Sequence, residues 1–286
     1  MTEVYILNAF SALADGGNPA GVVADANAMT EEQMQEVARL LGYSETAFVQ
    51  PSSVADFKVR FFTPVAEVDL CGHATIATFS LLFHLKEIQS GKYFQETRAG
   101  VFDVDITESG KVFMTQSEPV FGDAVDKQLI ARSLNISIED LHPDLEPQVV
   151  STGLKDIIVP IKDLKTLSEI QPDFAQVSAL SKELDVIGYH LFSLATASNA
   201  TASCRNLAPL FGIDEEAATG TASGALSCYL FSNGIIDEAK AATLIYEQGH
   251  FMNRPSKIEA RLDIFEGRIN RVEVGGVAHL LEKRMV

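Results

Sequence analysis

Two segments of this chain resemble each other at a spacing of about half its length. Residues 67–83 align without a gap with residues 215–231, an offset of 148 positions (215 minus 67) in a chain of 286. A repeat of this period predicts two similar lobes rather than a solenoid of short units. The identical pairs are Glu67/Glu215, Gly72/Gly220, Ala74/Ala222, Ala77/Ala225, Leu82/Leu230 and Phe83/Phe231.

Both copies follow the same order of residue types. An acidic loop leads into a turn that contains glycine, and a run of residues without Asp, Glu, Lys or Arg follows at 74–85 and at 222–231. A helix that is apolar on every side is buried on every side. We therefore expect two cores, each wrapped around one central helix.

Most of the remaining sequence predicts strands, so the expected fold class is α+β. Residues 57–62 alternate apolar with basic side chains, which is typical of a half-buried strand. Residues 30–41 predict a surface helix that begins with a capping box at Thr30 and ends at Gly42. The acidic stretch near 117–126 is the expected linker between the lobes.

The charge balance excludes some classes of partner. Lys and Arg number 22 and Asp and Glu number 39, which gives a formal net charge of −17 at pH 7. Such a surface repels nucleic-acid phosphates and anionic membranes, so we expect neither as a partner. An anionic small substrate would need a locally positive or dipolar site.

Cysteine usage and the N-terminal sequence indicate a reducing compartment. The three cysteines lack C-x-x-C spacing, and the first ten residues lack the basic region of a signal peptide. We therefore expect a cytoplasmic protein. The uncharged run at 70–85 is too short to span a membrane, and the run at 217–236 contains too many Ser, Thr and Gly residues.

Glu45 is the first candidate for chemistry. It lies between the end of the amphipathic helix and an apolar strand. Burial would raise the pKa of this carboxyl and make it a usable proton shuttle near neutral pH. The structural alternative is a solvated glutamate at the exit of a helix.

The segment Asp69–Thr75 places Gly72 and His73 where the first central helix begins. The backbone N–H groups and the dipole at that end attract a carboxylate or phosphate. His73 could exchange a proton with a bound acid. The alternative is a core histidine that donates to a backbone carbonyl.

The repeat partner of this segment is Glu215–Ala222, which brings a second helix N-terminus. Glu216 would be a second carboxylate there, and Thr221 would supply a hydroxyl in the place of His73. Two carboxylates and one histidine around an anion site could perform acid–base chemistry without a cofactor. The six histidines are scattered, so the sequence predicts no metal site, and G-x-G-x-x-G, Walker and G-x-S-x-G motifs are absent.

Eight short motifs in order along the chain resemble the PhzF-like family, the phenazine-biosynthesis isomerase family. They are Asn8-Ala9-Phe10, Gly17-Asn18-Pro19-Ala20, Ser44-Glu45-Thr46-Ala47-Phe48-Val49, Phe62-Thr63-Pro64, Glu67-Val68-Asp69-Leu70-Cys71-Gly72-His73-Ala74-Thr75, Arg205-Asn206-Leu207-Ala208-Pro209, Thr219-Gly220-Thr221-Ala222, and Glu247-Gln248-Gly249 before Arg254-Pro255-Ser256.

The resemblance implies the diaminopimelate epimerase fold. Its two pseudo-symmetric lobes are each a curled, mostly antiparallel, barrel-like sheet around a central helix, with the active site in the cleft between the lobes. We expect residues 1–118 in the N-terminal lobe, completed by 271–286, and residues 119–270 in the C-terminal lobe. The family also implies a homodimer.

The characterised member of the family isomerises trans-2,3-dihydro-3-hydroxyanthranilate without a cofactor. The resemblance therefore implies a cofactor-independent isomerase that moves a proton between carbons of a small, possibly cyclic, carboxylate substrate. The implied catalytic residues are Glu45 as the proton shuttle, with His73 and Glu216 assisting. The implied substrate-binding residues are Asn18, Gly72, Ala74, Gly220, Thr221 and Ala222.

The chain departs from the family pattern before the second helix; the departure at Glu216 concerns the substrate more than the fold, and Thr221 keeps the hydroxyl of the family's serine. The family often has Asp followed by Pro where this chain has Glu216 and Ala217, and Ser where it has Thr221. The longer side chain of Glu216 must place its carboxylate differently.

Other functions stay open on the sequence alone. One is a small-molecule binding protein on the same scaffold without turnover, and another is a purely structural dimerisation module. A racemase with two facing cysteines is disfavoured, because the repeat places Thr219 opposite Cys71 and a threonine cannot replace a thiolate base.

Overall fold

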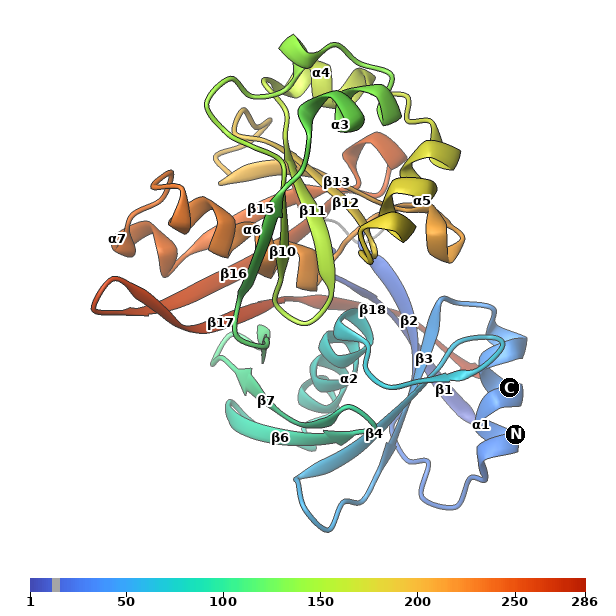
Figure 1. Cartoon of the computed structure of the whole chain (residues 1–286). Helices are drawn as coiled ribbons and strands as arrows, with labels where there is room; N and C mark the ends of the chain where they lie inside the picture. The colour runs from blue at the N-terminus through green and yellow to red at the C-terminus, as the bar shows by residue number, and fades with distance from the viewer. Residues whose placement is uncertain (12–15) are drawn as a thin grey trace. The chain divides into compact units, whose positions relative to one another are not determined.

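The computed structural model describes residues 1–11 and 16–286 of the chain (Figure 1). These residues form two compact units. Unit 1 contains residues 1–115 and 275–286, and unit 2 contains residues 116–274. The sequence placed these boundaries three or four residues away, at 118 and 271. Gln116 N donates to Val272 O and Ser117 N donates to Thr152 O, which ties residues 116 and 117 to unit 2.

The stretch at 117–126, expected to be a linker, is instead part of a sheet. It contains β9 (Val120–Ala124), which pairs antiparallel with β10 (Gln148–Ser151) of the same unit. Every residue of β9 is exposed, and its sequence, Val-Phe-Gly-Asp-Ala, does not alternate apolar with polar residues, so no pattern there indicates a strand.

The sheet of unit 1 is mostly antiparallel. Its order is β18-β1-β2-β3-β4-β6-β7-β8, in which β2–β3 and β4–β6 are parallel and the other pairs are antiparallel, while β5 pairs with β4. Its strands are β1 (Glu3–Ala9), β2 (Asn18–Val23), β3 (Glu45–Gln50), β4 (Phe57–Phe62), β5 (Glu67–Val68), β6 (Gly91–Thr97), β7 (Gly100–Ile106), β8 (Val112–Thr115) and β18 (Ala278–Met285).

The sheet of unit 2 repeats this plan. Its order is β9-β10-β11-β12-β13-β15-β16, again with the third and fifth pairs parallel, and β14 pairs with β13 as β5 does with β4. The internal repeat of the sequence is thus a repeat of topology. The further strands are β11 (Lys155–Pro160), β12 (Gly188–Ser193), β13 (Ala202–Ala208), β14 (Ile213–Glu216), β15 (Leu244–Gln248), β16 (Ser256–Phe265) and β17 (Arg268–Gly276).

Each unit has the central helix that the sequence predicted. They are α2 (Gly72–His84) in unit 1 and α6 (Gly220–Ser232) in unit 2. Every residue is buried from 73 to 82 in α2 and from 222 to 230 in α6. Their N-caps also correspond: Cys71 has φ −143° and ψ 117°, and Thr219 has φ −130° and ψ 103°.

The predicted surface helix is α1 (Glu31–Leu41). Its capping box is formed, because Gln33 N donates to Thr30 Oγ1 at 3.3 Å and Thr30 N donates to Gln33 Oε1 at 2.9 Å. Gly42 ends the helix with φ +68°, a left-handed conformation that glycine adopts without strain.

Helices also cover the outer face of the unit 2 sheet. They are α3 (Lys127–Ser133), α4 (Leu164–Glu169) and α5 (Phe174–Glu183), which Figure 1 shows on one side of β11 and β12; the short α7 (Glu238–Ala241) packs near α6. Alternate strand residues such as Ile157 and Tyr189 pack against these outer helices. Successive residues of a strand point to opposite faces. Asp156, next to Ile157, and His190, next to Tyr189, therefore face the other side of the sheet, where α6 packs.

No helix among the described residues is long and apolar enough to cross a membrane.

Gly188, the first residue of β12, lies where the backbone of β13 leaves no space for a side chain. An added Cβ would lie 1.8 Å from Leu207 O. We expect Gly188→Ala to lower the free energy of unfolding by about 3 kcal/mol or more, because the backbone must move. Gly42→Ala is the control: it meets no neighbour within 4 Å, so only the left-handed backbone opposes it, at about 1 kcal/mol. Urea denaturation of both variants measures the difference, and equal losses would contradict this explanation.

Candidate active site

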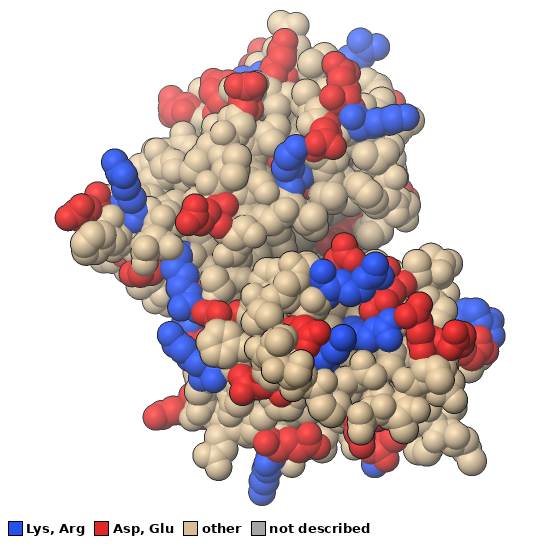
Figure 2. All heavy atoms as spheres, turned by 60° about the horizontal axis from the view of Figure 1, so that its bottom comes forward, with Lys and Arg blue, Asp and Glu red and all other residues tan. Residues whose placement is uncertain are grey.

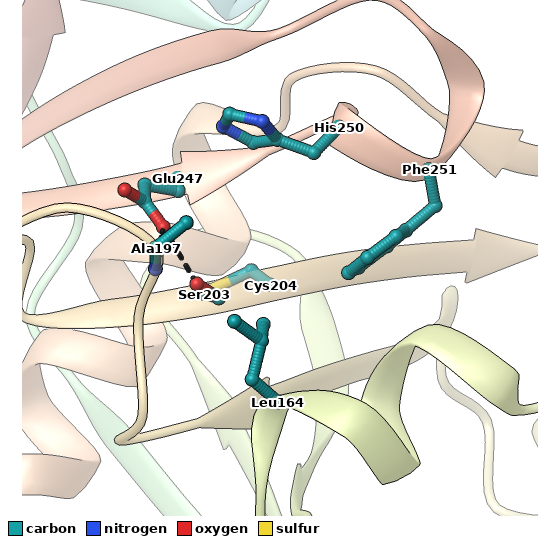
Figure 3. Close-up of a pocket in the computed structure, with 7 residues that line it drawn as sticks. All are labelled: Leu164, Ala197, Ser203, Cys204, Glu247, His250 and Phe251. Carbon is teal, nitrogen blue, oxygen red and sulfur yellow. Dashed lines mark hydrogen bonds between the residues drawn. The ribbon is translucent and has the colours of Figure 1, made fainter.

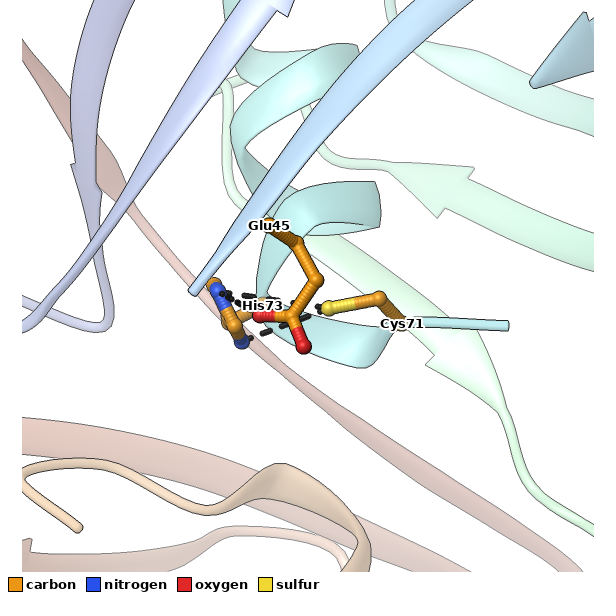
Figure 4. A group of neighbouring side chains, drawn as sticks. All are labelled: Glu45, Cys71 and His73. Carbon is orange, nitrogen blue, oxygen red and sulfur yellow. Dashed lines mark hydrogen bonds and ion pairs between the residues drawn. The ribbon is translucent and has the colours of Figure 1, made fainter. Parts of the chain in front are cut away.

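Three side chains that could handle protons or metals meet in unit 1 (Figure 4). Glu45 is the first residue of β3, His73 is the second residue of α2, and Cys71 is the N-cap of that helix. Glu45 Oε2 lies 3.2 Å from His73 Nε2, and Cys71 Sγ lies 3.4 Å from His73 Nδ1. The predicted catalytic pair, Glu45 and His73, is therefore adjacent in space.

Two more side chains approach the His73 ring. Asn18, at the start of β2, has Nδ2 at 3.5 Å from His73 Nδ1, and Ser44 Oγ lies 3.4 Å from His73 Nε2. An amide nitrogen only donates, so the Asn18 contact, although long, fits the tautomer that carries its proton on Nε2, the nitrogen that faces Glu45. Asn18, one of the predicted substrate-binding residues, thus contacts a predicted catalytic residue.

The carboxylate of Glu45 has an acceptor that no hydrogen bond uses. Oε2 is buried and has no hydrogen-bond partner among the described residues, since its contact with His73 lacks hydrogen-bond geometry. A buried acceptor without a donor costs free energy. The side chain as a whole is 20% exposed, so a small molecule can reach its atoms other than Oε2. This arrangement suits a base that accepts a proton from a substrate.

The predicted anion-binding residues Gly72 and Ala74 lie in the first turn of α2. The first bond of the helix ladder runs from Thr75 N to Cys71 O at 3.0 Å, so the N–H groups of residues 72–74 precede it. They lie at the positive end of the helix dipole. Gly72 has nothing within 4 Å of an added Cβ, which leaves space beside the backbone.

The other predicted group lies in unit 2. Glu216 ends β14, and Gly220, Thr221 and Ala222 form the first turn of α6. Thr219 Oγ1 donates to Glu216 Oε2 at 2.6 Å. This bond, which the sequence did not predict, fixes the carboxylate directly before the helix.

Gln248 organises this region, and sequence reasoning missed its role. Its Nε2 donates to Glu216 O at 2.8 Å and to Thr219 Oγ1 at 3.1 Å, and its Oε1 accepts from Thr219 N at 3.2 Å. Because the amide donates to the Thr219 oxygen, the hydroxyl proton of Thr219 points at Glu216. The signal available in the sequence was the amide side chain of Gln248 within the family motif Glu247-Gln248-Gly249.

A forked arginine–glutamate pair precedes each central helix. Arg60 donates from Nε and Nη2 to Glu67 at 2.7 Å each, and Arg205 donates to Glu215 at 3.0 and 2.8 Å. The Arg60 guanidinium holds the pKa of Glu67 below its ordinary value. Because these pairs are bidentate and largely buried, they fix the loops more firmly than surface ion pairs do.

Two buried titratable groups lie under α6. Burial raises the pKa of Asp156 to about 8, and the charge of Glu216 adds to this rise. Burial lowers the pKa of His190 to about 4, although its Nδ1 bonds to Asn206 Oδ1 at 2.9 Å. Asp156 Oδ1 and His190 Nε2 have no hydrogen-bond partner among the described residues. Near neutral pH both groups are therefore uncharged.

A small cavity in unit 2 does not belong to either predicted group (Figure 3). Its volume is about 70 Å³, and its lining residues are Leu164, Ala197, Ser203, Cys204, Glu247, His250 and Phe251. Glu247 accepts from Ala197 N, Ser198 N and Ser203 Oγ at 2.7–3.2 Å. Burial opposes these donors, but together they hold the pKa of Glu247 below its ordinary value. The carboxylate thus anchors a loop rather than offering a site.

A metal could be held in unit 1. Glu45, Cys71 and His73 each offer one donor atom, and these atoms lie within 4.8 Å of one another. The sequence predicted no metal site because its six histidines are scattered, and Glu45 lies 28 positions from His73. That prediction stays untested.

The other two cysteines cannot supply a second thiolate base. Cys204 and Cys228 are buried, and burial raises the pKa of both thiols, that of Cys228 to about 12. Thr219, not a cysteine, is the N-cap that corresponds to Cys71. The residues present do not fit a two-cysteine racemase.

Acidic side chains are spread widely over the face shown in Figure 2, with Lys and Arg between them. The net charge of −17 is thus not gathered in one patch on this face.

Comparisons with known proteins show which family the chain resembles. The family described as "Phenazine biosynthesis-like protein" matches residues 7–284. An uncharacterized isomerase of Clostridium acetobutylicum is 35% identical over 297 residues, which cover 98% of this chain and 96% of the relative. A trans-2,3-dihydro-3-hydroxyanthranilate isomerase of Pseudomonas chlororaphis is 28% identical over 286 residues, with 96% of each chain covered.

Solved structures confirm the predicted fold. A phenazine biosynthesis protein of the PhzF family from Bacillus anthracis matches with a TM-score of 0.90 and 30% identity, covering 100% of this chain and 98% of that one. A hydroxyproline epimerase of Agrobacterium vitis matches with a TM-score of 0.62 and 12% identity, covering 99% and 91%, and shares the fold alone.

The buried carboxyl of Asp156 predicts a specific dependence of stability on pH. Between about pH 4 and pH 8 the unfolded chain releases a proton that the folded protein keeps, so this group makes the free energy of unfolding fall as pH rises. Asp156→Asn removes that loss. From pH 5 to pH 8, we expect the free energy of unfolding of the variant to rise by roughly 3–4 kcal/mol relative to that of the wild type.

Urea denaturation at several pH values measures this gain, with Asp144→Asn, an exposed acid of the same unit, as the control. If the free energies of unfolding of the wild type and Asp156→Asn change equally with pH, Asp156 is ionised in the folded protein. His190 acts in the opposite sense at lower pH: its contribution is lost as pH falls from about 6.5 to about 4.

Proposed function

We propose that this isomerase, which belongs to the PhzF family of phenazine biosynthesis-like proteins, moves a proton between two carbons of a small carboxylate substrate. The observation that carries the proposal is the carboxylate of Glu45. Its Oε2 is buried without a hydrogen-bond donor and lies 3.2 Å from His73 Nε2.

Glu45 is the general base and then the general acid. A carboxylate with an unused acceptor can take a proton from a substrate carbon and return it to another carbon of the same molecule. His73, with its proton on Nε2, can donate a hydrogen bond to the substrate as negative charge develops there. The step needs no group beyond these side chains, and atoms balance because the proton returns to the substrate.

The first turn of α2 supplies the anion site. The N–H groups of residues 72–74 point out of the helix at the positive end of its dipole, close to His73 and Glu45. A substrate carboxylate bound there would be held against the repulsion of a protein with a net charge of −17. The hydroxyanthranilate isomerase of P. chlororaphis supports a cyclic carboxylate as the substrate class.

Glu216 and the first turn of α6 contribute to the same reaction in this proposal. The hydroxyl of Thr219 and the amide of Gln248 fix the Glu216 carboxylate and its backbone. A carboxylate held in one orientation suits the recognition of a donor group on a substrate. The relatives that are named isomerases favour turnover over the alternative of a binding protein.

Replacing Glu45 tests the proposal directly. We expect Glu45→Gln to lower the rate of proton transfer by roughly 10²–10⁴-fold, because the amide cannot accept the proton. The measurement is deuterium incorporation by NMR in D₂O, with trans-2,3-dihydro-3-hydroxyanthranilate and a pool of cyclic amino and hydroxy acids as substrates.

Glu108→Gln, at an exposed turn of the same unit, is the matched control and should exchange at the wild-type rate. Undiminished exchange in Glu45→Gln would assign the base to another residue. Binding of a pool member without any exchange in the wild type would favour the binding protein.

Glu216 is tested with a pair of variants. We expect Glu216→Gln to lower the exchange rate at least about tenfold, because it removes the charge that Thr219 and Gln248 position. Glu216→Asp, which keeps the charge, should retain more activity. If the wild type and both variants have equal rates, Glu216 has no part in the reaction.

We also propose that the protein works as a homodimer in the cytoplasm, as its family resemblance and its cysteine usage imply. Multi-angle light scattering gives the mass in solution. A mass near the 31.0 kDa of a single chain would refute the dimer.

A further inference from the structure

We propose that Glu45, Cys71 and His73 form a site for a thiophilic divalent cation of the zinc class, and that a cation bound there blocks proton transfer. The binding stands on the geometry of the three side chains. The inhibition of proton transfer rests on the proposed function. A direct measurement of cation binding tests the site independently of that function.

The spacing of the donor atoms fits tetrahedral coordination. Zinc bonds of about 2.0–2.3 Å to N, O and S at tetrahedral angles place neighbouring donor atoms roughly 3.3–3.5 Å apart. His73 Nε2 lies 3.2 Å from Glu45 Oε2 and 3.9 Å from Cys71 Sγ, and all three donors lie within 4.8 Å of one another. Side-chain movements of about an ångström would bring the three donors to one cation.

The chemistry of the donors selects the cation. A thiolate, an imidazole and a carboxylate together suit Zn²⁺ and Co²⁺, whereas Mg²⁺ and Ca²⁺ prefer oxygen donors alone. Glu45 Oε2 is a buried acceptor without a hydrogen-bond donor, and a cation would supply the missing partner. Three protein ligands leave the fourth position to water.

Binding requires two proton movements. The Cys71 thiol releases its proton to water as the thiolate forms the metal bond. His73 ligates through Nε2, so its proton moves to Nδ1, which faces Asn18. A turn of the Asn18 amide that presents Oδ1 in place of Nδ2 keeps that contact and orients the ring.

The site is accessible, and the other thiols are not. The Glu45 side chain is 20% exposed and that of His73 is 9% exposed. Cys204 and Cys228 are at most 1% exposed. Of the three thiols, that of Cys71 is therefore the most accessible to a cation in the folded protein.

Cobalt titration of the whole protein tests the site without a substrate. Co²⁺ bound to a thiolate gives a charge-transfer band in the near ultraviolet, and its intense visible bands report tetrahedral coordination. We expect both in the wild type, and we expect added Zn²⁺ to abolish both by displacing the cobalt. We expect Cys71→Ser to lose the charge-transfer band, and Cys71→Ser and Glu45→Gln each to weaken binding by roughly tenfold or more.

Cys228→Ala is the matched control, because it removes a cysteine outside the site and should bind like the wild type. Protection of Cys71 from alkylation by Zn²⁺, measured on the wild type by mass spectrometry, keeps the test valid if a variant fails to fold. Absence of cobalt bands in the wild type, or bands unchanged in Cys71→Ser, would overturn the site. Binding without loss of deuterium exchange would overturn the block alone.

Discussion

The burial of an uncharged helix inside each sheet is the constraint on which the rest of this structure depends. The residues of α2 and α6 are buried through most of their length, so each sheet must curl around its helix. Burial on all sides also fixes where each helix begins. The first N–H groups of α2, beside Glu45, are therefore held in place by the core rather than by a flexible loop.

The forked pairs explain the acidic residue that opens each repeat. Glu67 and Glu215 match in the alignment because each receives two hydrogen bonds from an arginine on the strand beside it, Arg60 or Arg205. The fork joins the strand to the loop that enters the central helix. The start of each central helix thus has an equivalent forked ion pair beside it.

Local patterns predicted the elements, and long-range contacts decided the rest. The central helices and the Thr30 capping box could be predicted because uncharged runs and caps are local signals. Strand β9 was missed because all its residues are exposed. The roles of Gln248 and Asp156 depend on partners at least 29 positions away in the sequence, and no spacing within their own segments reveals them.

The two units share one strand order, but only unit 1 carries the proposed base, Glu45. β3 and β12 are the fourth strands in the orders of their units, and they begin with Glu45 and Gly188 respectively. Leu207 O leaves no space for a side chain at Gly188. Racemases that invert a carbon use two groups on opposite faces of it. A duplicated scaffold with one shuttle must collect and deliver the hydrogen on a single face, so the proposed transfer is suprafacial and part of an isotopic label should stay within the molecule.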